Sequence, residues 1–123
     1  MPEKKKILFV CTHNVSRSRT AEDLFINSQE YEVKSAGLLF HQDGKQVVAQ
    51  ELINWADVVI AMNETEWSNG RPPCRHSSKL KEKFDLKEKK IVILGIPDVY
   101  GRGNSHLIWL LRSKLKEIAG INI

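Results

Sequence analysis

The feature that most constrains this chain is a short apolar segment that runs into a polar loop and then into a helix. Ile7–Val10 is apolar throughout and flanked by charge, which is typical of a strand buried on both faces. Cys11 follows at once, Arg17 comes six positions later, and a helix is expected from Ser18, as its cap, to about Gln29. Such a strand, loop and helix start form an anion site, because loop N–H groups and the helix dipole point the same way.

Further apolar strands alternate with helices along the rest of the chain. Strands are expected at 31–36, 58–62 and 91–94, and helices at 46–55, 79–84 and 105–119, with 63–78 irregular. In the last helix Ile108, Leu111, Leu115 and Ile118 are expected to share the buried face, and Gly120 to end it. This pattern predicts one small doubly wound α/β domain over 1–123, with a parallel sheet covered on both faces.

The loop after the first strand carries residues suited to phosphoryl chemistry. Loop N–H groups stabilise a thiolate, which is the nucleophilic form of Cys11. Arg17 adds a planar fork of donors that matches two oxygens of a bound phosphate. Ligands of doubly wound domains bind beyond the carboxyl ends of the strands, where Ser35–Gly37 and Ile96–Asp98 are also expected. The combination predicts phosphoryl transfer through a cysteine.

Composition narrows the possible partners. The net charge is +4, but the basic segment 79–90 is interleaved with acids and has no aromatic stacking platform, so no nucleic-acid partner is expected. No apolar run approaches the ~18 residues of a membrane span, and no secretory signal is visible, which predicts a cytoplasmic protein without a membrane partner. Two cysteines form no disulfide framework, and the histidines lack ligand spacing. We therefore expect a monomer without metal or cofactor.

Taken in order, several segments resemble the low-molecular-weight protein tyrosine phosphatases. The likeness rests on the strand and loop that end at Arg17–Ser18 and on four further segments: Thr20–Glu22, Ser35–Gly37, Ala56–Met62 and Pro97–Gly101. It is greatest to a compact branch of the family with an Ile-Pro-Asp-x-Tyr loop. The resemblance implies a four-stranded parallel sheet flanked by helices on both faces. It also implies hydrolysis of aryl phosphomonoesters through a phosphocysteine, with a phosphotyrosine-containing protein or a small aryl phosphate as substrate.

The resemblance also assigns roles by position. Cys11 would be the nucleophile and Arg17 the clamp on the phosphoryl oxygens, while Asp98 would protonate the leaving phenolate and then help to activate water. Ser18 would hydrogen-bond the thiolate. Apart from these positional matches, Phe40 and Tyr100 are candidates for the rim around an aromatic substrate ring. Residues that bind the phosphate or support the loop would be Thr12, His13, Asn14, Val15, Ser16, Ser18 and Ser35, with Asn14 and Ser35 holding its conformation.

Departures from the family pattern leave alternatives open. Ser16 stands where many members carry a second cysteine, and the segment after Gly37 that shapes substrate choice is short. An arsenate reductase on the same fold is one alternative, although Asn63 stands about where its first relay cysteine is expected and only Cys74 remains nearby. A second alternative is a phosphocysteine carrier of a sugar-transport system, which has a similar fold and an early cysteine. The loop of such a carrier does not need a clamping arginine, so Arg17 counts against this alternative. A non-catalytic module that binds phosphotyrosine or an oxyanion is a further class.

Overall fold

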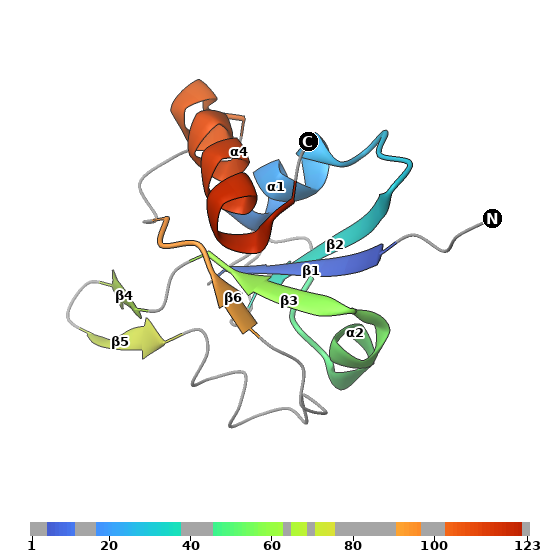
Figure 1. Ribbon diagram of the computed structural model, residues 1–123. Coiled ribbons are helices and arrows are strands. Elements are labelled where there is room, and N and C mark those ends of the chain that lie inside the picture. Colours follow the sequence, from blue (N-terminus) through green and yellow to red (C-terminus); the bar gives the residue numbers. More distant parts are fainter. Residues whose placement is uncertain are drawn as a thin grey trace.

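The computed structural model describes residues 5–11, 17–37, 46–62, 65–68, 71–75, 91–96 and 103–121. Strands and helices alternate along most of this part of the chain (Figure 1). In order, the elements are β1 (Lys5–Cys11), α1 (Arg17–Leu24), β2 (Tyr31–Gly37), α2 (Gln50–Trp55), β3 (Val58–Ala61), β4 (Thr65–Ser68), β5 (Arg71–Arg75), β6 (Ile91–Ile93) and α4 (Ser105–Ala119).

Four of the strands form a parallel sheet in the order β2-β1-β3-β6. β1 is central, with Ile7 paired to Val33 of β2 and to Val58 of β3. Parallel neighbours need crossover connections, and the helices between these strands supply two of them. The predicted four-stranded parallel sheet of a doubly wound domain is confirmed.

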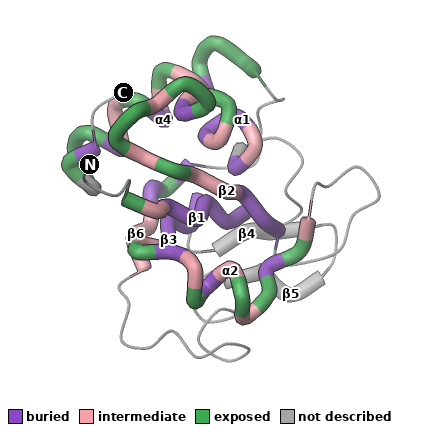
Figure 2. The backbone as a smooth tube through the Cα atoms, turned by 90° about the vertical axis from the view of Figure 1, so that its right-hand side faces the viewer, coloured by how far each residue is buried: buried purple, intermediate pink, exposed green. Residues whose placement is uncertain are grey.

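Helices cover both faces of this sheet (Figures 1 and 2). Side chains alternate along a strand, so Ile7, Phe9 and Cys11 pack with the α1 and α4 side chains, whereas Leu8 and Val10 pack with those of α2. All five residues are buried. Burial on both faces explains why β1 is apolar throughout rather than alternating, as the sequence indicated.

α4 begins and ends with identifiable caps. The Asn104 side chain accepts hydrogen bonds from the backbone N–H groups of His106 and Leu107, and Gly120 ends the helix in the left-handed conformation at φ 68°. The prediction that Gly120 ends this helix is confirmed. No helix in the described part of the chain is long and apolar enough to cross a membrane.

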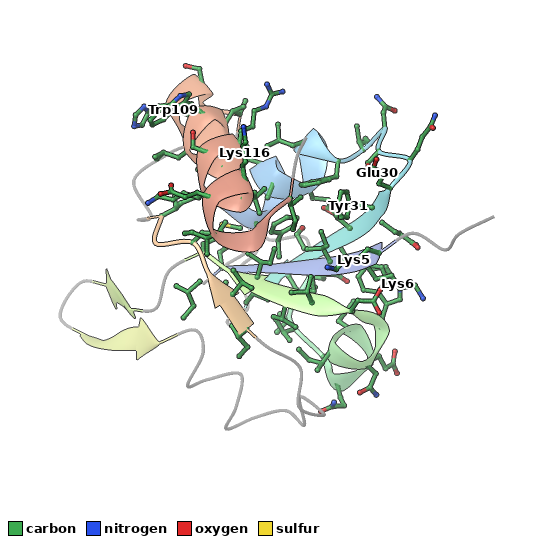
Figure 3. The ribbon with its side chains drawn as sticks, viewed as in Figure 1. Lys5, Lys6, Glu30, Tyr31, Trp109 and Lys116 are labelled. Carbon is green, nitrogen blue, oxygen red and sulfur yellow. The ribbon has the colours of Figure 1, made fainter. Side chains whose placement is uncertain are left out.

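The buried face of α4 differs from the predicted one. Leu107, Leu111 and Leu115 are fully buried, at the i, i+4 spacing of one helix face. Ile118 is 47% exposed, so its predicted place on the buried face is wrong. Trp109 is 61% exposed and points away from the sheet, with its ring stacked on that of His106 (Figure 3).

The first two helices are shorter than predicted. α1 starts at Arg17, so Ser18 lies inside its first turn and is not the cap. After Leu24 the chain makes short turns, in which Ser28 Oγ accepts from Glu30 N and Tyr31 N. The second helix starts at Gln50 rather than at 46, because Val47 instead forms a parallel bridge with Gly37.

β4 and β5 form a separate antiparallel pair within 63–78, which the sequence analysis predicted to be irregular. Thr65 pairs with Arg75, and the register shifts between Glu66 and Ser68. Two prolines stand within β5, and proline has no N–H for a ladder, so the segment lacks the usual strand signal. The helix predicted near 79–84 lies outside the described residues.

Candidate active site

Cys11 lies at the carboxyl end of β1, the central strand. β1 is followed in the chain by β2 on one side, while β3 occupies its other side, so the strand order reverses at β1. Doubly wound domains bind ligands at such a switch point, beyond the carboxyl ends of the strands. Cys11 is in register with Gly37 of β2, and Met62, next to the end of β3, donates its N–H to Val10 O at 2.9 Å. Three strand ends therefore meet around the cysteine.

The cysteine sulfur contacts a hydroxyl on the first turn of α1. Cys11 Sγ and Ser18 Oγ are 3.0 Å apart, and the two residues are 3% and 0% exposed. When the sulfur is a thiolate, it can only accept, so the Ser18 hydroxyl donates. The start of α1 adds its positive dipole end beside this pair. The predicted Ser18 contact with the sulfur is present.

A second hydroxyl joins the end of β2 to the same helix. Ser35, which is fully buried, donates from Oγ to Glu22 Oε1 at 2.8 Å, and Gln46 Nε2 donates to Ser35 O at 2.9 Å. Glu22 follows Ser18 by four residues, so both lie on one face of α1. The predicted role of Ser35 in holding the loop with Asn14 stays a prediction, because Asn14 lies outside the described residues.

Gly37, the last residue of β2, is hydrogen-bonded to the part of the chain just before α2. Gly37 N–H donates to Gln46 O and Gly37 O accepts from Val48 N–H, both at 2.8 Å. Gly37 is also in register with Cys11, so its contacts with Gln46 and Val48 lie at the carboxyl end of β1. Phe40, a predicted rim residue, lies outside the described residues.

A third hydroxyl contacts the backbone just before α4. Thr20 of α1 is 1% exposed, and its Oγ1 accepts from Gly103 N–H at 3.0 Å. Ile96, which follows β6, donates its N–H to Met62 O at 2.7 Å. Asp98 and Tyr100 themselves lie outside the described residues, so their predicted roles stay predictions.

The described structure therefore places Cys11, Ser18 and Ser35 at one edge of the sheet. Three further residues of this edge, Thr20, Glu22 and Gln46, received no role from the sequence. The signal for Thr20 and Glu22 was their place in Thr20–Glu22, a segment that carries the family resemblance, and Gln46 had no such signal. Thr12, His13, Asn14, Val15 and Ser16 lie outside the described residues, as does the side chain of Arg17.

Comparison with known families gives a match over the part of the chain that contains this site. The model of the low molecular weight phosphotyrosine protein phosphatase family matches residues 6–51, which include Cys11, Arg17 and Ser35. No curated protein sequence matches the chain.

Solved structures with the same fold cover nearly the whole chain. A mutant of YwlE from Bacillus subtilis is 25% identical, with a TM-score of 0.64, over 93% of this chain and 98% of its own. YwlE arginine phosphatase from Geobacillus stearothermophilus is 27% identical, with a TM-score of 0.60, over 92% and 84%. An arsenate reductase from Archaeoglobus fulgidus, 20% identical with a TM-score of 0.55 over 88% and 91%, shares the fold.

The described fold is the α/β fold of these solved structures, with Cys11 at the end of its central strand. The resemblance to the low molecular weight phosphotyrosine protein phosphatase family is confirmed by the family match and by these structures. The family match and the YwlE structures support a cysteine-based enzyme of the phosphatase type.

Proposed function

We propose that the protein is a cysteine-dependent phosphatase that hydrolyses aryl phosphomonoesters through a phosphocysteine intermediate. The observation that carries this proposal is the 3.0 Å contact between Cys11 Sγ and Ser18 Oγ at the switch point of the sheet. A buried sulfur with a hydroxyl donor and a helix start beside it suits a thiolate nucleophile.

The reaction has two displacements at phosphorus. In the first, the Cys11 thiolate forms the S–P bond, the P–O bond to the phenolic oxygen breaks, and Asp98 gives that oxygen its proton. In the second, water forms a new O–P bond as Asp98 takes its proton, and the S–P bond breaks to return the thiolate. Arg17 and the loop N–H groups hold the phosphoryl oxygens in both steps, and Ser18 stabilises the departing sulfur.

The proposed substrates are a phosphotyrosine-containing protein or a small aryl phosphate. A second candidate is phosphoarginine, because three of the matching structures are of YwlE, two of them described as an arginine phosphatase. The same two displacements would serve, with a P–N bond broken in the first step. The leaving group differs between the two candidate substrates, so the importance of proton donation by Asp98 differs as well.

The test is hydrolysis of p-nitrophenyl phosphate at about pH 6, where an acidic optimum is expected, without added metal. The wild-type protein is measured beside Cys11→Ser and beside Cys74→Ser as a matched control. We expect turnover that is lost in Cys11→Ser and retained in Cys74→Ser. Phosphotyrosine and phosphoarginine are then compared by kcat/KM, which ranks the two substrate classes.

Other outcomes would contradict the proposal. Stoichiometric phosphate binding by the folded, reduced wild type without hydrolysis of any ester would identify a binding module. Arsenate-dependent consumption of thiol that falls in Cys74→Ser would identify a reductase with an internal relay.

A further inference from the structure

One face of α4 carries an aromatic ring among basic side chains, and it lies opposite the leucines that the helix buries. Trp109, Arg112 and Lys116 follow one another at i, i+3 and i+7, which is the spacing of neighbours on one helix face. His106 stands three residues before Trp109, with its ring stacked on the indole at a centroid distance of 5.7 Å. All four residues are exposed, and we refer to them as the outer stripe of α4.

The outer stripe is positively charged and contains no acid. Within Ser105–Ala119 the acid is Glu117, which lies about 80° around the helix from Trp109, whereas Arg112 and Lys116 lie within about 60° of it. In the described part of the chain, neither Arg112 nor Lys116 forms an ion pair with an acid. Lys116 in the last turn also interacts favourably with the helix dipole, but Arg112 precedes that turn. The dipole therefore does not explain the basic charge of the whole stripe.

Trp109 gives the outer stripe an apolar centre. Its side chain is 61% exposed, although an indole is among the largest apolar groups that a protein can bury. The stack with His106 restricts the ring, so less side-chain freedom is lost when a partner covers it. Tryptophan and arginine are the side chains enriched where protein interfaces gain most of their affinity. The stripe therefore has the composition of a binding surface.

We propose that the outer stripe of α4 is a docking surface for an acidic peptide segment of a partner protein. An aliphatic or aromatic side chain of that segment packs on Trp109, and its carboxylates pair with Arg112 and Lys116. These two residues are about 6 Å apart along the helix axis, close to two residues of an extended peptide. Carboxylates at alternate positions of the segment therefore match the stripe. The inference goes beyond the proposed phosphatase reaction and does not depend on it.

Other occupants fit the outer stripe less well. A second copy in two-fold contact would place the basic residues against one another, which is repulsive. Membrane binding grows with the apolar area inserted, and Ile118, the other large apolar side chain exposed on the described part of α4, lies about 180° around the helix from Trp109. A single indole also offers a nucleic acid one stacking position rather than a platform.

The test is a binding titration followed by fluorescence anisotropy. The probe is a fluorescein-labelled peptide with one phenylalanine followed by glutamate at every second position, and the control probe has glutamine in place of glutamate. We expect the wild-type protein to bind the glutamate peptide saturably with a micromolar Kd, and the glutamine peptide at least about tenfold more weakly. Added salt should weaken the binding of the glutamate peptide, because exposed charges are screened.

Matched charge reversals separate a local contact from the field of the whole protein. Arg112→Glu acts within the outer stripe, whereas Lys5→Glu reverses an exposed lysine at the amino end of β1, away from Trp109 (Figure 3). We expect Kd to rise at least about tenfold in Arg112→Glu, about fivefold in Trp109→Ala and less than about twofold in Lys5→Glu. All three side chains are exposed, so each melting temperature should stay within about 3 °C of the wild type.

Several results would overturn the proposal. They are no saturable binding by the folded wild type, equal binding of the two peptides, or an equal rise of Kd in Lys5→Glu and Arg112→Glu. Tighter binding of phosphatidylserine vesicles or of an oligothymidine than of the glutamate peptide would identify a membrane or nucleic-acid surface instead. A wild-type dimer that Arg112→Glu converts into a monomer, as measured by sedimentation, would assign the stripe to a second copy. None of these results bears on ester hydrolysis, so the phosphatase proposal is tested separately.

Discussion

The two faces of the parallel sheet are built from the same alternating strands but differ in the kinds of side chain that they bury. Among the described residues, the buried side chains on the α2 face are apolar, and they are Leu8, Val10, Ala36, Val48, Ile53, Ala56 and Val59. The α1/α4 side combines apolar residues with Cys11 and with the buried hydroxyls of Ser18, Thr20 and Ser35. Apolar packing depends on volume, whereas each buried hydroxyl depends on one partner. The difference separates residues that stabilise the sheet from residues that organise the cysteine.

The largest expected effect within this comparison is on stability and comes from the α2 face. Ile53 is fully buried there, and Ile53→Ala should lower the free energy of unfolding by about 2–5 kcal/mol, because it removes apolar contacts and leaves a cavity. Below the shifted melting temperature, kcat/KM should equal that of the wild type. Urea unfolding and the p-nitrophenyl phosphate assay measure the two quantities.

The matched variant is Leu111→Ala, which removes a fully buried side chain of α4 on the other side of the sheet. Its stability loss should be of the same size. If Ile53→Ala changed the ratio of phenyl to p-nitrophenyl phosphate hydrolysis, the α2 face would also organise the site and the comparison would break down.

The next effect is kinetic and comes from the hydroxyl beside the sulfur. Ser18→Ala removes the donor that stabilises the departing thiolate, so hydrolysis of the phosphocysteine should slow by about tenfold. Rapid mixing with p-nitrophenyl phosphate should then show a burst of p-nitrophenol, followed by a slow steady rate.

Ser28→Ala is the control for Ser18→Ala. Ser28 Oγ accepts two backbone N–H groups in the turn after α1, away from the sulfur. Its loss should cost about 1 kcal/mol of stability without a burst. Equal steady-state rates in Ser18→Ala and the wild type would show that the 3.0 Å contact has no part in catalysis.

The smallest expected effect concerns Ser35. Ser35→Ala removes the bond to Glu22, which retains another interaction, so we expect a loss of about 1 kcal/mol in unfolding free energy. kcat should change by less than about twofold. Thermal unfolding and the ester assay check both values, and a tenfold loss of kcat would place Ser35 among the residues that organise the cysteine directly.

Local patterns were enough to predict most of the sheet and the centre of the site. Ile7–Val10 is apolar because both faces of β1 are covered, and Cys11 follows it directly, so the strand and the cysteine were visible together. The pair β4–β5 was missed because its prolines lack N–H groups and its register is irregular. The early end of α1 and the late start of α2 reflect turn and bridge contacts that no periodicity encodes.

The residues that support the site depend on contacts between distant segments. Cys11, Ser18 and Ser35 stand in short motifs whose chemistry can be recognised along the chain, and the parallel strand order follows from buried strands that alternate with helices. Thr20 and Gly103 are far apart in sequence, and neither segment carries a sequence signal that predicts a contact with the other. A hydroxyl can bond any nearby donor, so the packing of α1 against the sheet and the path of the chain into α4 decided which N–H Thr20 accepts.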